Sequence, residues 1–321
     1  MANVQPILRK ERLEIMKIIL ITGGTGFIGK NLIDRLRREN QYKIVCLVQS
    51  DDEIGKQYLK KNNISFLSED DFVSFNGRID ICVHLASYGV AYGARDLNLM
   101  IDVNVKLSTR IMKFCVEHGC EFFVNTGSCF EYGSKIQNRL ITENDTLCPE
   151  DIYAATKVAC EDLLKVYSHL LGVKMITIRP FSIFGRYENQ SRIGPLVINS
   201  GNLNQKLELT GGDQVRDYMD VRDVSDAIVR LLENREKTID GEAINICSGI
   251  PLTLKQFILK IVDAFGFDHK LYQFGVKPYR SNESMFFAGN NKRLFEIIGT
   301  QDYSVTDNKI RESYDKCQFP L

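Results

Sequence analysis

The stretch that decides the fold of this chain is KIILITGGTGFIG, residues 17–29. Its first six residues form a continuous apolar run rich in β-branched side chains. Such a run is typical of a strand buried on both faces, as in a parallel sheet. Glycines follow at once, and residues 27–38 then place apolar side chains at helical spacing. The order strand, glycine-rich turn, amphipathic helix predicts the first unit of a nucleotide-binding α/β fold.

The three glycines of this turn have separate roles in the prediction. Gly23 allows a tight exit from the strand, Gly26 lets the backbone approach a pyrophosphate, and Gly29 lets the helix pack close to the sheet. The helix N–H groups and the positive end of its dipole then face the phosphates. We therefore expect a dinucleotide at this turn, in contact with Gly23, Gly26, Phe27, Ile28 and Gly29.

Strands and helices continue to alternate along the chain. Apolar runs predict strands at 43–48, 64–67, 79–85, 121–126 and 173–179, and helical spacing predicts helices at 52–62, 96–118 and 152–171. Strand–helix alternation with short connections predicts an α/β fold with a doubly wound, Rossmann-type parallel sheet.

The pattern changes after Pro180, where Gly, Asn, Gln and Arg become frequent. Helices are expected again at 221–233 and 253–265. We predict the following organisation: an N-terminal extension at 1–16, a dinucleotide-binding domain at 17–180 with a returning segment at about 215–250, and a smaller C-terminal α/β substrate-binding region made of 181–214 and 251–321.

Composition excludes several classes of protein. The chain has 321 residues, 44% of them hydrophobic and 26% charged, and a formal net charge of zero. We therefore expect no bulk electrostatic binding of nucleic acid or of an acidic membrane. No apolar stretch approaches the roughly 20 residues of a membrane helix, and no secretory signal is visible. The nine cysteines include no CxxC pair, which favours buried free thiols in a cytoplasmic protein and no bound metal.

The end of the second expected strand bears on the choice of cofactor. An NAD site usually has an acid there for the ribose 2′-OH, and Val48 occupies that position. Gln49 and Ser50 can donate hydrogen bonds to a 2′-phosphate, although two aspartates follow them. NADP(H) is therefore favoured over NAD(H).

Three residues form a candidate catalytic group. Tyr153 and Lys157 are four residues apart at the start of a predicted helix and so share a face. The lysine can lower the tyrosine pKa and hold the nicotinamide ribose, while the tyrosine exchanges a proton with a sugar oxygen. Ser128 follows a predicted strand, at the sheet edge where ligands bind, and can hydrogen-bond the same oxygen.

These motifs together resemble the extended short-chain dehydrogenase/reductases. The resemblance covers GxxGxxG at 23–29, HLAS at 84–87, Asn104 in DVNV, the serine motif leading to YG at 132–133, YxxxK, and RPFSIFG at 179–185. It implies a homodimer through helices 96–118 and 152–171, a nucleotide-diphosphate sugar as substrate, and further cofactor contacts from Leu85, Ala86, Ser87, Asn104, Thr126, Tyr153, Lys157, Pro180 and Ser182.

The residues after Ser128 narrow the reaction. The 4,6-dehydratases of this family usually carry Asp-Glu there, whereas this chain has Cys129 and Phe130. Phenylalanine transfers no proton, so dehydration is not expected. Hydride chemistry remains, either reduction of a 4-keto group or 4-epimerisation with tightly held NAD. The absent acid near Val48 favours a consumed NADPH, hence reduction. A non-catalytic dinucleotide-binding sensor is a third reading, disfavoured by the intact catalytic group.

The C-terminal region resembles the same family in two arginine segments. Arg216 in GGDQVRDY and Arg280 in RSNE match segments that contact the nucleotide diphosphate, and the planar guanidinium suits phosphate. The tail resembles 4-keto-6-deoxyhexose reductases related to CDP-abequose synthase. Tyr88 is a further candidate for substrate contact.

Overall fold

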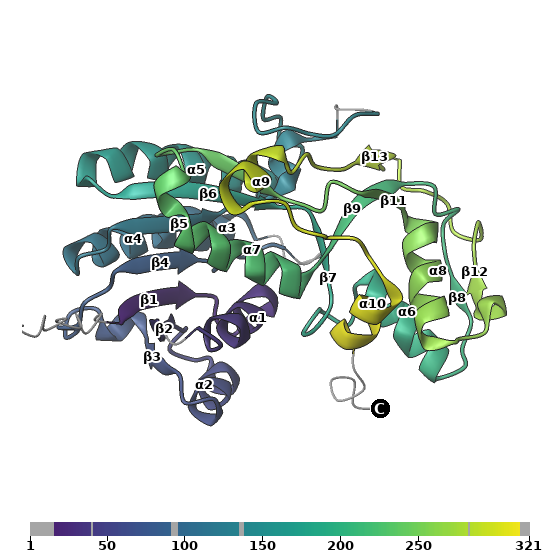
Figure 1. The fold of residues 1–321 in the computed structure, drawn as a ribbon, viewed down its shortest axis with the longest axis horizontal. Helices are drawn as coiled ribbons and strands as arrows, with labels where there is room; N and C mark the ends of the chain where they lie inside the picture. The colour runs from purple at the N-terminus through teal and green to yellow at the C-terminus, as the bar shows by residue number, and fades with distance from the viewer. Residues whose placement is uncertain (1–15, 40, 91–95, 135–137, 282, 315–321) are drawn as a thin grey trace, which may run out of the picture.

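A parallel sheet of seven strands forms the larger part of the molecule (Figure 1). The computed structural model describes residues 16–39, 41–90, 96–134, 138–281 and 283–314, so the predicted N-terminal extension lies outside the described residues except for Met16. The strand order is β10-β6-β5-β4-β1-β2-β3. In chain order the strands are β1 Lys17–Thr22, β2 Tyr42–Leu47, β3 Ser65–Leu67, β4 Ile81–His84, β5 Phe122–Thr126, β6 Lys174–Pro180 and β10 Ala243–Ile246.

Helices cover both faces of this sheet, which confirms the predicted doubly wound fold. One face packs against α1 (Phe27–Leu36), α2 (Glu53–Lys61), α7 (Val221–Glu233) and α9 (Lys292–Ile298). The other face packs against α4 (Ser108–Glu117) and α5 (Ile152–Leu171). Successive strands are added on one side of β1 as far as β3 and on its other side from β4 onward, so the order of strands reverses between β1 and β4. In such sheets, ligands bind beyond the carboxyl ends of the strands at this switch point.

The single helix expected at 96–118 has an irregular middle. It begins as α3 (Leu97–Ile101), widens into a π-helical segment at Asp102–Leu107, and continues as α4. The wide turn contains Asn104, whose side chain is fully buried. Such π-bulges are frequent at functional sites.

The second lobe has a small sheet with its own core. Strand β9 (Val215–Asp220) pairs with β7 (Ser182–Phe184), β11 (Pro251–Thr253) and β13 (Phe286–Phe287). Helices α6 (Ile193–Asn202), α8 (Leu254–Phe265) and α10 (Asp307–Ser313) pack on it, and β8 (Leu207–Glu208) pairs with β12 (Tyr272–Gln273). Short 3₁₀ turns lie at Glu69–Asp71, Cys129–Tyr132, Arg235–Lys237 and His269–Leu271.

The segment expected to return to the first domain contributes to both sheets. Strand β9 belongs to the second lobe, whereas α7 packs on α1 and β10 extends the large sheet beside β6. The two lobes are therefore connected through continuous secondary structure.

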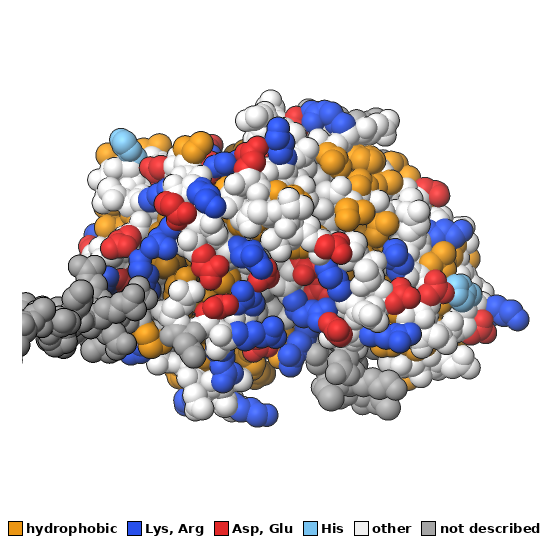
Figure 2. All heavy atoms as spheres, viewed as in Figure 1, with side chains coloured by type: hydrophobic (Ala, Val, Ile, Leu, Met, Phe, Trp, Pro, Cys, Tyr) orange, Lys and Arg blue, Asp and Glu red, His pale blue; other side chains and the backbone are white. Residues whose placement is uncertain are grey.

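The face shown in Figure 2 is mixed in charge, and hydrophobic side chains gather on it over β11 and β13. Ile250 and Met285, which directly precede these strands, are both exposed. Within the described residues, no helix is long and apolar enough to cross a membrane. The same residues contain no group of three or more His, Cys, Asp or Glu side chains arranged to hold a metal ion.

Candidate active site

The glycine-rich turn lies at the carboxyl end of β1, which is next to β4 at the switch point of the sheet. Gly23 has φ +67°, and the N–H of Gly26 donates to its carbonyl oxygen at 3.0 Å. A Cβ on Gly29 would lie 2.2 Å from the same oxygen. Because backbone atoms surround this position, α1 can approach the strand only with glycine here. The turn therefore has the compact geometry expected of a phosphate-binding turn.

The neighbouring strand end is held by a buried histidine. His84 Nδ1 lies 2.7 Å from Thr22 Oγ1, and its Nε2 lies 2.8 Å from Ser108 Oγ on α4. Burial lowers the pKa of His84 to about 3, and the Lys157 ammonium adds to the effect. The imidazole is therefore neutral. Thr22 Oγ1 also accepts the N–H of Ala86 at 3.1 Å, which places Leu85 and Ala86 beside Gly23.

Asn104 connects the turn after β4 to α5. Its side-chain oxygen accepts the N–H of Tyr88 at 2.8 Å and the hydroxyl of Ser87 at 3.3 Å. Its amide nitrogen donates to Tyr88 O and to Thr156 Oγ1, both at 3.0 Å. The Asn104 amide thus binds protein groups and shapes the turn that carries Ser87 and Tyr88. Its predicted contact with a cofactor stays a prediction.

The structure brings Ser128, Tyr153 and Lys157 together at the carboxyl ends of β4 and β5. Asp151 caps α5 by accepting the N–H of Ala154 at 2.8 Å, which places Tyr153 in the first helical turn. All three candidate catalytic side chains are buried. Burial raises the pKa of Tyr153 to about 12, and hydrogen bonding with Ser87 and Ser128 opposes this rise. Burial also lowers the pKa of Lys157. Burial, rather than the expected effect of the lysine, therefore dominates the tyrosine pKa.

Ser128 begins the 3₁₀ turn Cys129–Tyr132. Its backbone N–H donates to Glu131 Oε1 at 2.6 Å, and its Oγ accepts the N–H of Phe130 at 3.3 Å, so Ser128 caps the N-terminal end of the turn. Burial raises the pKa of the Cys129 thiol to about 12, which keeps it neutral. The ring of Phe130 is 56% exposed and stacks on Phe287 with a centroid distance of 6.0 Å.

A buried ionic group behind this turn was not anticipated from the sequence. Arg179 Nε donates to Glu131 Oε2 at 2.6 Å, and its terminal nitrogens donate to Tyr132 Oη at 3.0 Å and Glu161 Oε2 at 2.8 Å. Two features of the sequence could have indicated this ionic group: an acid inside the serine turn, Glu131, and an arginine directly before Pro180, Arg179.

The residues at the carboxyl end of β5 fit a nicotinamide cofactor. Thr126 Oγ1 is buried and, within the described part of the chain, has no hydrogen-bond partner. Pro180 ends the adjacent strand β6, and Ser182 begins β7 at the lobe boundary. An unsatisfied hydroxyl at a ligand-binding sheet edge fits a polar group of a bound molecule.

Two charged side chains from other segments lie at the end of β2, and the sequence alone did not predict that they meet there. Val48 is buried, whereas Gln49 and Ser50 are exposed. Lys56 Nζ donates to the carbonyl oxygen of Ser50 at 2.5 Å, while the Ser50 hydroxyl donates to Asp70 at 2.5 Å. A lysine and an aspartate therefore both flank this strand end.

The two arginine segments of the second lobe come together. Arg216 donates to Glu283 Oε1 at 2.6 Å and to the carbonyl oxygen of Ser284 at 2.8 Å. The segment of Arg280, itself exposed, thus lies against β9. Arg216 and Arg192 both lower the pKa of the Cys129 thiol, which places their charges near the serine turn. Arg192 directly precedes α6 and was not among the predicted residues.

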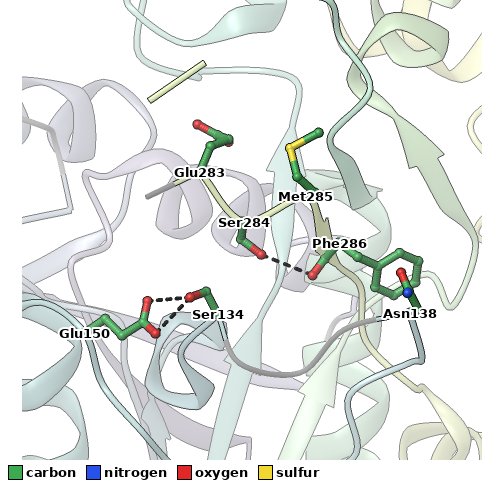
Figure 3. Close-up of a pocket in the computed structure, with 7 residues that line it drawn as sticks. All are labelled: Ser134, Asn138, Glu150, Glu283, Ser284, Met285 and Phe286. Atoms are coloured by element: carbon green, nitrogen blue, oxygen red, sulfur yellow. Dashed lines mark hydrogen bonds between the residues drawn. The ribbon is translucent and has the colours of Figure 1, made fainter. Parts of the chain in front are cut away.

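A pocket of about 550 Å³ borders the Arg216–Glu283 pair (Figure 3). One wall carries Ser134, whose hydroxyl donates to Glu150 at 2.7 Å, and the opposite wall is the segment from Glu283 to Phe286. The lining contains none of the three candidate catalytic residues, and the pocket meets the candidate diphosphate site through Glu283.

Comparison with known proteins supports this description. The fold matches UDP-N-acetylglucosamine 4-epimerase from Methanobrevibacter ruminantium with a TM-score of 0.80 and 20% identity, over 93% of this chain and 97% of that one. CDP-abequose synthase from Salmonella typhimurium is 23% identical over 87% of this chain and 92% of its own length. GDP-6-deoxy-D-talose 4-dehydrogenase from Aggregatibacter actinomycetemcomitans is 26% identical over 90% and 93%. The sequence model of the NAD dependent epimerase/dehydratase family matches residues 19–247. The chain therefore belongs to this family of NAD(P)-dependent enzymes.

Proposed function

We propose that the protein reduces the 4-keto group of a nucleotide-diphospho-4-keto-6-deoxyhexose, using NAD(P)H. The observation that carries the proposal is the composition of the serine turn. Ser128 lies with Tyr153, whereas the next two positions hold a neutral buried thiol and an exposed phenyl ring. This set of groups supports proton transfer at one oxygen and supplies no acid–base pair for eliminating water.

The side chains of the site divide the work of the reduction. A bound reduced nicotinamide supplies the hydride. Tyr153 is protonated at neutral pH, because burial raises its pKa to about 12, and it donates its proton to the sugar O4. Ser128 hydrogen-bonds the same oxygen and orients it toward Tyr153. Lys157, buried on the same face of α5, binds the nicotinamide ribose. Thr126 Oγ1 supplies a further polar contact for the cofactor.

The substrate diphosphate is assigned to the cations of the second lobe. Arg216 donates two of its N–H groups to Glu283 and Ser284, so its guanidinium is held in one orientation before substrate arrives. Arg280 and Arg192 add charge on neighbouring segments. Tyr88 is assigned to the sugar, and Asn104 holds the turn that carries it.

The relatives support the class of substrate. Their printed names refer to a CDP-linked sugar in one case and to a 4-dehydrogenase of a GDP-linked 6-deoxysugar in the other. Both matches extend over at least 87% of this chain. Oxidoreduction at C4 of a nucleotide-linked 6-deoxyhexose agrees with these names and with the composition of the serine turn.

The alternative is a nucleotide-sugar 4-epimerase that retains NAD. It needs the same Ser128, Tyr153 and Lys157, and the matched fold includes 4-epimerases. The two reactions differ in whether the cofactor is consumed, so the fate of added NADPH separates them.

We propose NADP(H) as the preferred cofactor. Val48 removes the acid that would repel a 2′-phosphate, Gln49 is exposed at the strand end, and Lys56 Nζ lies 2.5 Å from the Ser50 carbonyl oxygen. Asp70 beside Ser50 opposes this preference. The ratio of kcat/KM for NADPH and NADH, measured before and after Lys56→Ala, tests it. A ratio that the substitution does not lower would contradict the role of Lys56.

We also propose a cytoplasmic homodimer. On α5, the apolar side chains of Leu163, Val166 and Leu170 are 46%, 63% and 74% exposed. They form one stripe, beside a groove of about 330 Å³ lined by α4 and α5 side chains. A second copy of the chain would bury this stripe. The eight described cysteines are free thiols, which suits a reducing compartment.

Absorbance at 340 nm tests the proposed reduction. The purified enzyme receives NADPH or NADH and a 4-keto-6-deoxyhexose linked to dTDP, CDP, GDP or UDP. We expect NADPH oxidation with one of these sugars. In Tyr153→Phe we expect the rate of this oxidation to fall about 10²–10⁴-fold, with cofactor binding retained. No oxidation with any of them, together with NAD released from the denatured protein, would favour the epimerase instead.

A further inference from the structure

Four charged side chains form a continuous chain beneath the catalytic group. Arg179, on β6, is in the centre and binds Glu131 at 2.6 Å and Glu161 at 2.8 Å. Lys165 pairs with the other oxygen of Glu161 at the outer end. The Arg179, Glu131 and Glu161 side chains are at most 3% exposed. The alternating charges compensate one another inside the protein.

This chain of ion pairs joins the two segments that carry the reacting hydroxyls. Glu131 belongs to the serine turn and accepts the backbone N–H of Ser128 at 2.6 Å. Glu161 is on α5, one helical turn beyond Lys157 and two turns beyond Tyr153. Arg179 therefore connects the Ser128 turn to the helix that carries the proton donor.

The arrangement is costly for a purely structural device. Ion pairs taken out of water contribute little net stability, and apolar residues of similar volume often serve equally well. The neighbouring backbone is also adapted to it, because a Cβ on Gly127 would lie 2.5 Å from Glu131 Oε1 and 2.9 Å from Thr177 Cγ2. Hydrogen bonds in an ionic network fix direction as well as distance, which apolar packing does not.

We propose that Glu131 is a positioning residue, which acts through Arg179 and Glu161 to keep the Ser128 and Tyr153 hydroxyls directed at one substrate oxygen. The identity of that oxygen rests on the proposed function. The coupling between the turn and the helix does not, because it follows from the contacts alone. Displacement of a catalytic group by about 1 Å can reduce a rate by about 10²-fold.

The charge of Glu131 also acts on the proton donor. The groups that face Tyr153 are the hydroxyls of Ser87 and Ser128, the Cys129 thiol and the Glu131 carboxylate, with Lys157 on the same helix. Among them, the Glu131 carboxylate raises the pKa of Tyr153 by its negative charge. Replacing Glu131 with a neutral residue therefore shifts the alkaline limb of the pH–rate profile to lower pH.

The test compares Glu131→Gln with Glu242→Gln in the full-length protein loaded with NADPH. Glu242 is a matched control. It also accepts the N–H of the residue three positions earlier (Ile239, 2.6 Å) and also pairs with an arginine (Arg293, 2.8 Å). That arginine is on α9, so the pair does not join the two catalytic segments. We expect Glu131→Gln to lower kcat about 10²-fold, with KM and the NADPH Kd within about twofold of the native values. Glu242→Gln should leave kcat unchanged.

Hydrogen–deuterium exchange gives a second readout that requires no turnover. In Glu131→Gln we expect faster exchange in residues 126–133 and also in residues 152–161, and in Glu242→Gln in neither. If only the first segment exchanges faster, the coupling through Arg179 is refuted. Equal losses of kcat in both variants would refute a positioning role.

The two proposals fail in different ways. If the native enzyme interconverts sugars without consuming NADPH, the reductase proposal fails, and the same kcat comparison is made on epimerisation. Should Glu131→Gln not fold, Glu131→Asp retains the charge but is one methylene too short to reach both partners. We expect Glu131→Asp to lower kcat and to accelerate exchange in both segments, and native behaviour in this variant would overturn the proposal.

Discussion

Substitution of two glycines in the same turn separates cofactor binding from helix packing. In Gly29→Ala the new Cβ would lie 2.2 Å from the Gly23 carbonyl oxygen and 2.6 Å from Gly24 Cα. In Gly26→Ala the Cβ would lie 3.2 Å from the same oxygen, and Gly26 has φ −82°, which alanine adopts readily. The first change forces backbone apart, whereas the second requires a shift of a few tenths of an ångström.

The expected magnitudes follow from these contacts. Gly29→Ala overpacks a rigid backbone position, so we expect a loss of about 1–3 kcal/mol in the free energy of unfolding. For a domain of this size, each kcal/mol lowers Tm by about 2–4 °C. Gly26→Ala should change Tm by little. Both variants should lose at least about tenfold in NADPH affinity, about 1.4 kcal/mol, because Gly26→Ala places a methyl where the pyrophosphate approaches and Gly29→Ala displaces α1.

The assay combines thermal unfolding of the cofactor-free protein with a fluorescence titration of NADPH. Affinity lost in both variants and Tm lowered only in Gly29→Ala is the expected pattern. Native NADPH affinity in Gly26→Ala would refute the placement of the pyrophosphate at this turn. A native Tm in Gly29→Ala would refute the packing analysis.

Three further predictions concern the substrate, the assembly and the pH dependence of stability. Arg216→Ala should raise KM for the nucleotide sugar at least about tenfold with a smaller change in kcat, whereas Arg230→Ala on α7 should leave KM unchanged. Equal KM values for Arg216→Ala and the native protein in steady-state kinetics would contradict diphosphate binding by Arg216. Leu170→Glu should convert the dimer to a monomer in light scattering. Leu203→Glu, which changes another exposed leucine on the second lobe, should leave the dimer intact. A native protein that is already monomeric would refute the dimer proposal. His84 binds no proton in the folded state above its pKa of about 3, whereas the unfolded chain binds one below about 6.5. The folded state therefore loses stability as the pH falls through this window, by about 1.4 kcal/mol per pH unit from this group. Urea unfolding at pH 7, 6 and 5 gives the free energy of unfolding as a function of pH, and this dependence should be shallower in His84→Asn than in the native protein. The same pH dependence in both proteins would mean that His84 titrates in the folded protein.

Elements whose signals are local were predicted closely from the sequence. The strand at 17–22 and the helices at 152–171 and 221–233 have the predicted bounds. For α5 the reason is visible at both ends, because Asp151 accepts the N–H of Ala154 and Gly172 adopts the left-handed conformation that ends a helix. Hydrophobic period, caps and glycine positions are all written within a few residues, so sequence reasoning reaches them.

Features that depend on distant partners were not predictable in the same way. The π-helical turn follows no local pattern, and its buried Asn104 binds Thr156, 52 residues away. Glu131 meets Arg179 across 48 residues, and Arg216 meets Glu283 across 67. Which charges become buried neighbours depends on strand order and crossover, and these are properties of the folded chain.

The sequence by itself therefore determined the class of fold, the glycine turn and the identity of the candidate proton donor, because each is encoded in a short run of residues. Only the tertiary structure decided that burial raises the pKa of Tyr153 and that an ionic chain connects its helix to Ser128. Solvent exclusion and charge pairing arise when strands β5 and β6 and helix α5 come together, and no one of these segments specifies them alone.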